Sequence, residues 1–365
     1  MVGIALDEKT ISSFSRGAVF NNRPDRMVRI ALSELFVGRT FMSRWFYARG
    51  CASPSPYSLT RNLQAVSEHI EVAHTRVNSI SFHRTEDLLV SASNDDLIKI
   101  YDTSRGKELG TLRSKKYGAA NVCYTHDPQS VVYSSTKASH AWRYHDLEAN
   151  RYVKYFSGHT GRVTALHVSP MTDSVLSASE DKQVRLWDLR SGECEGVLKA
   201  PGIPTCSFDE QGLVFCVAAE TGIVRLYDAR KWSSGPFASF TVEAERKSNA
   251  VFSVIRSSLD GKRLMAVVEG RIYVMDAFTG MIGCTVNTGV PMGGQPLEAS
   301  LSPDGKFVLS GCNDRHIRVW STETGKEVAL WPQASDIPTC LKFSPKKMLV
   351  ASASQEVCLW IPSIA

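Results

Sequence analysis

The chain has 365 residues, a formal net charge of +5, and 43% hydrophobic and 22% charged residues. This composition is ordinary for a folded globular chain and excludes collagen, a long coiled coil and wholesale disorder. No run of about 18 apolar residues predicts a transmembrane helix, and the acids and lysine at positions 7–9 argue against a signal peptide. The nine cysteines include no CxxC pair, which fits reduced thiols in the cytosol or nucleus rather than a zinc ribbon or redox dithiol.

The positive charge is concentrated in residues 23–61, which hold seven arginines, no lysine and two acids, so the remainder of the chain carries no net charge. Three interpretations stay open. The aromatic residues at 45–47 among the arginines are suited to nucleic-acid contact. The apolar residues at 28, 32, 35 and 36 have the spacing of a short amphipathic helix lying on the folded remainder of the chain. The third interpretation, a flexible insertion or a retained intron, is favoured, and direct nucleic-acid binding is the less favoured one.

A five-residue motif recurs through the rest of the chain. Its copies are residues 98–102 (IKIYD), 184–188 (VRLWD), 224–228 (VRLYD), 272–276 (IYVMD) and 317–321 (IRVWS). With two weaker copies, the anchoring residues are Tyr101, Tyr144, Trp187, Tyr227, Met275, Trp320 and Trp360. Their spacings of 43, 43, 40, 48, 45 and 40 residues are close to the period of WD repeats, in which each unit is a four-stranded propeller blade.

Seven anchors predict an all-β, seven-bladed WD-repeat propeller. Only five residues follow Trp360, so the seventh unit lacks its outer strand. We predict that residues 11–20 (ISSFSRGAVF) supply this strand and cover an otherwise exposed sheet edge. The predicted organisation is therefore a closing strand in residues 1–22, a flexible or partly helical Arg-rich insertion in residues 23–73, and the propeller in residues 74–365.

Unit three carries the full polar signature of a WD repeat. Its members are His159, Asp181, Trp187 and a strand serine, either Ser177 or Ser179. We expect them to form a hydrogen-bonded network that fixes the blade. A nearly complete copy in unit one comprises His74, Asp95 and Tyr101.

A His–Asp–Ser trio also suggests a catalytic triad, but its recurrence within a repeat favours the structural role. The sequence has no nucleophile elbow, Walker loop or HExxH motif. We therefore expect no enzymatic activity, no cofactor and no metal site.

Several strings lie partly outside the general repeat positions and resemble one WD-repeat family. They are residues 113–118 (RSKKYG), 124–126 (YTH), 131–135 (VVYSS), 155–159 (YFSGH), 206–215 (CSFDEQGLVF), 235–240 (GPFASF), 276–278 (DAF) and 297–300 (LEAS). They resemble the WD-repeat subunit shared by Set1-type (COMPASS) histone methyltransferase complexes and a nuclear protein phosphatase 1 complex. The resemblance covers residues 7–22 and 74–364.

This resemblance implies a seven-bladed scaffold in the nucleus. It implies that the chain supports methylation of histone H3 on its lysine-4 and associates with the serine-phosphorylated C-terminal tail of RNA polymerase II. It also implies a part in transcription termination and RNA 3′-end processing. The family has only a short connection where residues 23–73 intervene here.

Basic residues expected on one propeller face are the candidate contacts for a phosphorylated peptide, because charge-assisted hydrogen bonds from such residues hold phosphate. The candidates are Arg76, Arg113, Lys115, Lys116, Tyr117, Arg162, Lys182 and Arg315. Lys115, Lys116 and Tyr117 are favoured because they lie in a string that resembles the family. For each residue the alternative is a solvated surface charge.

A second candidate surface comes from residues 184–190 (VRLWDLR) and 224–230 (VRLYDAR). Both resemble the WDxR-type box of substrate receptors for cullin-4 ubiquitin ligases, in which the arginine contacts the adaptor. By this resemblance the contact residues are Asp188, Arg190, Asp228 and Arg230. The alternative function is therefore a cullin-4 substrate receptor, and the two roles are not exclusive.

Overall fold

The computed structural model describes residues 63–65, 75–137, 139–219, 222–242, 251–289, 298–332 and 336–362. Internal contacts divide the chain into two units, Met1–Ser53 and Pro54–Ala365, and every described residue lies in the second. The described part of the chain consists of strands β1–β28 and one 3-10 turn, η1 (Trp232–Ser234). No helix in it is long and apolar enough to span a bilayer.

The strands form seven four-stranded antiparallel sheets, the blades, which we number in chain order. Blade 1 is β2 (Val77–Phe82), β3 (Leu88–Ser93), β4 (Leu97–Asp102) and β5 (Lys107–Arg113). Blade 2 is β6 (Ala120–Tyr124), β7 (Ser130–Ser134), β8 (Trp142–Asp146) and β9 (Arg151–Phe156). Blade 3 is β10 (Val163–Val168), β11 (Ser174–Ser179), β12 (Gln183–Asp188) and β13 (Cys194–Lys199).

The remaining blades repeat this arrangement. Blade 4 is β14 (Thr205–Phe208), β15 (Val214–Ala219), β16 (Ile223–Asp228) and β17 (Ala238–Thr241). Blade 5 is β18 (Phe252–Ser257), β19 (Arg263–Val268), β20 (Arg271–Asp276) and β21 (Ile282–Asn287). Blade 6 is β22 (Ala299–Leu301), β23 (Phe307–Gly311), β24 (His316–Ser321) and β25 (Glu327–Pro332). Blade 7 is β26 (Cys340–Phe343), β27 (Val350–Ala353), β28 (Val357–Pro362) and β1 (Leu63–Ala65).

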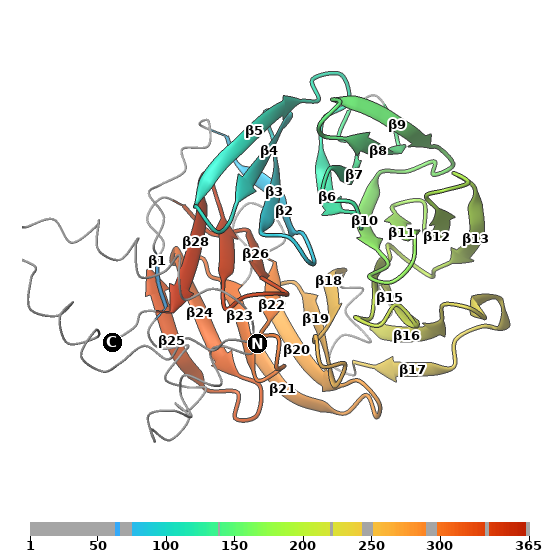
Figure 1. Cartoon of the computed structure of the whole chain (residues 1–365). Helices are drawn as coiled ribbons and strands as arrows, with labels where there is room; N and C mark the ends of the chain where they lie inside the picture. Colours follow the sequence, from blue (N-terminus) through green and yellow to red (C-terminus); the bar gives the residue numbers. More distant parts are fainter. Residues whose placement is uncertain are drawn as a thin grey trace, which may run out of the picture. The chain divides into compact units, whose positions relative to one another are not determined.

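The blades close into a ring (Figure 1). The first strand of each blade contacts the first strand of the next, and β26 of blade 7 returns to β2 of blade 1. Across that last junction, the Val77 N–H donates to the Ser354 carbonyl at 2.8 Å. Seven buried apolar clusters fill the seven seams between neighbouring blades. The predicted seven-bladed all-β propeller is confirmed.

The outer strand of blade 7 is β1, which pairs antiparallel with β28 and sets Leu63 opposite Pro362. This differs from the expectation that residues 11–20 fill the position. Residues 11–20 lie outside the described part of the chain, and β1 lies inside the segment that was predicted as an insertion. A strand at residue 63 is much closer in sequence to β2 than one at residue 20. The loop that connects it to blade 1 is therefore shorter, and closing that loop costs less conformational entropy.

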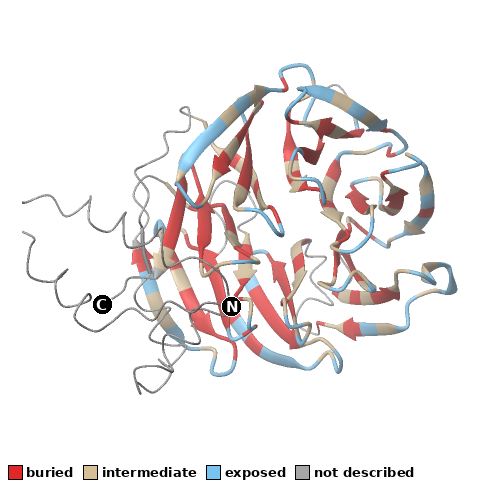
Figure 2. Ribbon diagram, in the orientation of Figure 1, coloured by how far each residue is buried: buried red, intermediate tan, exposed pale blue. Residues whose placement is uncertain are grey.

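Burial falls from the middle of each blade to its outer edge (Figure 2). In β7, β23 and β27 every residue is buried, as expected for strands covered on both sides. The fourth strands alternate between exposed and covered positions, as in β9. Exposed side chains are therefore concentrated in the turns and the outer strands.

Turns alternate between two ends of such a sheet, which defines two faces of the propeller. The first face carries the turns between second and third strands and the connections between blades. The second face carries the turns between first and second strands and between third and fourth strands. A central cavity of about 390 Å³ is lined by the first strands.

The anchor of blade 2 is His145 rather than the predicted Tyr144. His145 stands opposite Val131 as Trp187 stands opposite Val175 in blade 3, and in both blades the register shift of the outer pair falls just before this residue. The prediction was wrong by one residue because this degenerate copy has a histidine at the anchor position. The adjacent Tyr144 is the residue type found at the anchor of other units, so it was chosen instead.

Leu89 is fully buried in the seam between blades 1 and 7, whereas Leu109 in the same blade is 57% exposed. We expect Leu89→Ala to lower the free energy of unfolding by about 2–5 kcal/mol, since it removes packed methyl groups and leaves a cavity. Leu109→Ala should change it by less than about 0.5 kcal/mol. Denaturant titration checks both, and equal losses would contradict the assignment of the seam.

Candidate functional site: a basic and aromatic cluster on the first face

The polar signature of blade 3 forms a closed hydrogen-bonded network. His159 lies 2.8 Å from Asp181 through Nδ1 and 2.7 Å from the Ser177 hydroxyl through Nε2. The Trp187 Nε1–H donates to the same hydroxyl at 2.8 Å. Burial lowers the pKa of His159 against the opposing effect of Asp181, and the network therefore ties four elements of blade 3 together without presenting a nucleophile to solvent.

Other blades retain parts of this network. The Trp360 Nε1–H donates to Ser352 at 2.9 Å in blade 7, and Tyr101 lies 3.3 Å from Ser91 in blade 1. Asp95 accepts the Ser93 hydroxyl proton and the Leu97 N–H, while His74 lies outside the described residues. Across the described ranges, no group of three His, Cys, Asp or Glu side chains is placed to hold a metal ion.

Ser177 is fully buried and serves both His159 and Trp187. We expect Ser177→Ala to lower the free energy of unfolding by about 1–3 kcal/mol, because two buried groups lose their partner. Ser239→Ala, at an exposed position of β17, is the matched control and should have little effect. An equally small loss for both variants would contradict a stabilising network.

The eight candidate contact residues all fall on the first face, but the structure does not bring all of them together. Arg162 and Lys182 are exposed in blade 3, where the Glu180 N–H donates to the Arg162 carbonyl. Arg315 is exposed in the β23–β24 turn of blade 6, away from blades 2 and 3 around the ring. Arg76 precedes β2, lines the central cavity and has a buried Nε without a hydrogen-bond partner.

The other four candidates lie together in the turn between blades 1 and 2. Arg113, Lys115 and Lys116 are exposed there, and Tyr117 is half-buried. The turn is fixed by backbone bonds from the Tyr117 and Gly118 N–H groups to the Ser114 carbonyl, at 3.1 and 2.7 Å. The Lys116 Nζ lies 5.1 Å from the centroid of the Tyr117 ring.

Arg143 of β8 joins this group and was not predicted. Its guanidinium carbon lies 3.5 Å from the Tyr117 ring centroid and 5.6 Å from that of Tyr155, and its side chain is only 2% exposed. Tyr155 itself is 53% exposed on the outer strand β9. We define the basic-aromatic cluster as Arg113, Lys115, Lys116, Tyr117, Arg143 and Tyr155.

Arg143 differs from the basic residues at the same strand position in blades 1 and 6. That position lies opposite Ser91 in blade 1 and Ser310 in blade 6, and opposite Tyr133 in blade 2. Lys99 of blade 1 is paired with Glu108 at 3.0 Å, and Arg318 of blade 6 with Asp314 at 2.6 Å and Glu327 at 2.8 Å. Arg143 has neutral partners only, the Ser139 hydroxyl and the Ala141 carbonyl. Arg185 of blade 3, like Arg143, hydrogen-bonds only to a neutral group, the Gln183 amide oxygen.

The cluster thus has an excess of positive charge. Among the described residues, none of its four cations makes an ion pair, and the neighbouring Lys137 is neutralised by Asp96 at 2.5 Å. The pKa of Tyr117 lies below its ordinary value because the ammonium of Lys116 beside the phenol, together with the charge of Arg143, favours the phenolate. An anionic group would find several donors here without displacing a carboxylate, and two tyrosine rings beside them for apolar contact.

The two WDxR-type boxes lie on the second face. Asp188 accepts the Arg190 N–H and Asp228 accepts the Arg230 N–H, each at 2.8 Å, so both aspartates shape their turns. The arginine side chains are exposed, with Arg190 loosely paired with Asp173 at 3.6 Å.

Comparison with known proteins agrees with this architecture. Residues 66–102, 150–188 and 298–321 match the family described as WD domain, G-beta repeat. The chain is 40% identical to Protein ANTHESIS POMOTING FACTOR 1 of Arabidopsis thaliana, over 79% of this chain and 88% of that protein. It is 38% identical to WD repeat-containing protein 82 of Drosophila melanogaster, over 79% of this chain and 91% of that protein.

A third relative is Set1 complex component swd2 of Schizosaccharomyces pombe, 34% identical over 66% of this chain and 70% of that protein. These identities extend over most of the propeller and confirm the resemblance found in the sequence. The chain belongs to the family of WD-repeat proteins that includes Swd2 and WD repeat-containing protein 82.

Proposed function

We propose that this protein is a non-catalytic scaffold subunit of a Set1-type histone H3 lysine-4 methyltransferase complex in the nucleus. The observation that carries the proposal is its 34% identity to a fission-yeast protein named as a Set1 complex component. A scaffold role fits the fold, because the His–Asp–Ser trio of blade 3 is committed to a buried network. The two faces of turns remain for partner contacts.

We further propose that the basic-aromatic cluster links this complex to the serine-phosphorylated C-terminal tail of RNA polymerase II, and thereby to transcription termination. Phosphoserine carries nearly two negative charges and three acceptor oxygens. The exposed Lys115 and Lys116 supply flexible donors, while Tyr117 and Tyr155 offer surfaces for side chains beside the phosphate. Association with a protein phosphatase 1 complex is proposed from the family resemblance alone.

We expect Lys115→Glu plus Lys116→Glu to weaken binding of a phosphoserine peptide from that tail at least tenfold. The reason is that each lost charge-assisted hydrogen bond is worth about 1.5–3 kcal/mol and about 1.4 kcal/mol corresponds to a factor of ten. Fluorescence anisotropy with the full chain measures the affinity.

The matched control is Lys306→Glu plus Lys326→Glu, which changes the net charge equally through two exposed lysines on the second face of blade 6. It should leave the affinity near the wild-type value. Equal losses in both variants would indicate unspecific attraction, and an unchanged affinity in the Lys115 and Lys116 variant would exclude the cluster.

The alternative function, a substrate receptor of a cullin-4 ubiquitin ligase, is favoured by one observation. Arg190 and Arg230 occupy equivalent exposed turns of adjacent blades on the same face. Mass spectrometry of proteins purified with the full chain separates the two functions. We expect methyltransferase subunits. The alternative requires the cullin-4 adaptor in the wild-type sample and its loss with Arg190→Ala plus Arg230→Ala.

A further inference from the structure

The first strands of the seven blades share one equivalent position beside the central cavity. In each blade this residue stands opposite the second-strand residue that pairs with the neighbour of the anchor. We call the seven residues the central ring: Ser81, Cys123, His167, Ser207, Arg256, Ser300 and Lys342. All of them except Ser207 line the cavity. Two members, in blades 5 and 7, are therefore cations at the same level of the cavity.

In three blades the ring side chain joins the blade to the next one. It accepts a backbone N–H of the next first strand: Ser81 from Tyr124 at 3.4 Å, His167 through Nδ1 from Phe208 at 3.1 Å, and Ser300 from Phe343 at 3.0 Å. The ammonium of lysine and the guanidinium of arginine are donors only. Arg256 and Lys342 cannot make this contact, so the junction between blades does not account for a cation at either position.

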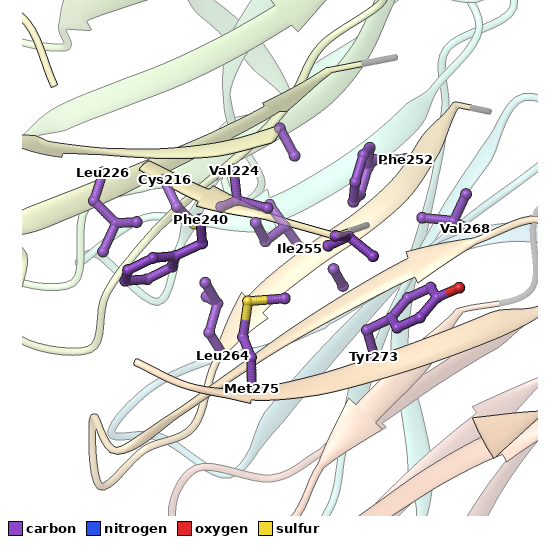
Figure 3. Close-up of a cluster of buried hydrophobic side chains, with 13 residues drawn as sticks. Cys216, Val224, Leu226, Phe240, Phe252, Ile255, Leu264, Val268, Tyr273 and Met275 are labelled. Carbon is purple, nitrogen blue, oxygen red and sulfur yellow. The ribbon is translucent and has the colours of Figure 1, made fainter. Parts of the chain in front are cut away.

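Arg256 lines the cavity from blade 5. Figure 3 shows the preceding residue, Ile255, in the buried cluster between blades 4 and 5, and successive side chains of a strand point to opposite sides. The Arg256 guanidinium donates to the Ile255 carbonyl at 3.1 Å, and among the described residues it makes no ion pair. Because a guanidinium has five N–H donors, most donors of Arg256 remain available to a ligand.

The charged groups of the cavity have a positive excess. Within the described part of the chain, those that line it are Arg76, Arg84, Arg256, Lys342, Glu210 and Glu298. Four positive and two negative charges give this lining a formal charge of +2. Lys342 is paired with Glu298, whereas Arg76 has a buried Nε without a hydrogen-bond partner.

The ring residue of blade 3 shows where the positive charges act. The pKa of His167 lies well below its ordinary value because of its burial and the positive charges of Arg256 and Lys342. These two cations thus act on the same part of the cavity, although they come from different blades. Since Nδ1 accepts the Phe208 N–H, neutral His167 carries its proton on Nε2 and has one N–H donor there.

Arg84 of blade 1 crosses the second-face end of the cavity. Its guanidinium donates to the Pro170 carbonyl of blade 3 and the Glu210 carbonyl of blade 4, each at 3.1 Å. An extended peptide that passed through the ring would have to break these bonds, which favours a small ligand. The volume of about 390 Å³ lies in the range of small-molecule sites.

We propose that the central cavity binds a phosphate group, either free or on a small molecule, with the Arg256 guanidinium as its main contact and Lys342 and His167 as further donors. A phosphate monoester has nearly two negative charges at pH 7, which matches the excess of the lining. The planar fork of an arginine binds two phosphate oxygens at once.

The test titrates the full chain with inorganic phosphate and with glycerol 3-phosphate by isothermal titration calorimetry. None of the six residues of the basic-aromatic cluster lines the cavity, so Lys115→Glu plus Lys116→Glu serves as the background that removes phosphate binding at the cluster. We expect one saturable site with a Kd of about 1 mM or below. Tighter binding of glycerol 3-phosphate would support an ester as the ligand, and equal binding would support free phosphate.

In this background, Arg256→Met should weaken binding about tenfold or more, because charge-assisted hydrogen bonds are lost. The matched control is Arg105→Met, which removes the same charge at an exposed position of the β4–β5 turn and should leave the affinity unchanged. Arg256→Lys keeps the charge without the fork and should bind with intermediate affinity, which retains the test if Arg256→Met does not fold.

The absence of saturable binding overturns the proposal, as does an unchanged affinity in the two Arg256 variants or an equal loss in Arg105→Met. Succinate binding as tightly as glycerol 3-phosphate would contradict a phosphate site. In the otherwise wild-type chain, Arg256→Met should retain its affinity for the phosphoserine tail peptide. A loss there would indicate that the peptide occupies the cavity, and would overturn the assignment to a small ligand.

Discussion

Every blade of this protein depends on its neighbours, because a single four-stranded sheet cannot bury both of its sides. The seven seam clusters meet this requirement, and each draws side chains from two adjacent blades. The seam between blades 1 and 7 exists only if the two ends of the array meet, so stability is a property of the closed ring. Core positions are therefore fixed by packing, and what varies freely is the chemistry of the turns on the two faces.

The repeat made the ring predictable, since an anchor every 40–48 residues reflects one blade. It was least informative where blades depart from the consensus. In blade 2, Tyr133 replaces the core serine and His145 replaces the tryptophan, and the two lie 3.3 Å apart. The closing strand was equally hard to place, because Leu63–Ala65 is three residues long and pairs through its backbone, which leaves little trace in side-chain pattern.

The candidate site was predicted in part for a related reason. Lys115, Lys116 and Tyr117 are adjacent in sequence and visible as a group, whereas Arg143 and Tyr155 reach them only through the fold of blade 2. One signal was available: a basic residue recurs in the third strand of several units, and acids stand near it in units one and six. No sequence pattern shows that Arg143, the basic residue of unit two, lacks an acidic partner. Whether such a residue forms an ion pair depends on which side chains the neighbouring strands place beside it.

The net charge of the chain does not describe the charge of the propeller. The excess of +5 lies in residues 23–61, so attraction between the propeller and an anionic partner cannot come from net charge. It must come from local imbalance, which arises where a basic strand residue such as Arg143 has no acidic partner. Arg143 tolerates burial without a carboxylate because Tyr117 and Tyr155 flank its guanidinium, and such desolvated cation–π contacts contribute about 2 kcal/mol. The same rings lie against both Arg143 and Lys116, so aromatic contacts in place of an ion pair stabilise Arg143 and leave its positive charge unneutralised.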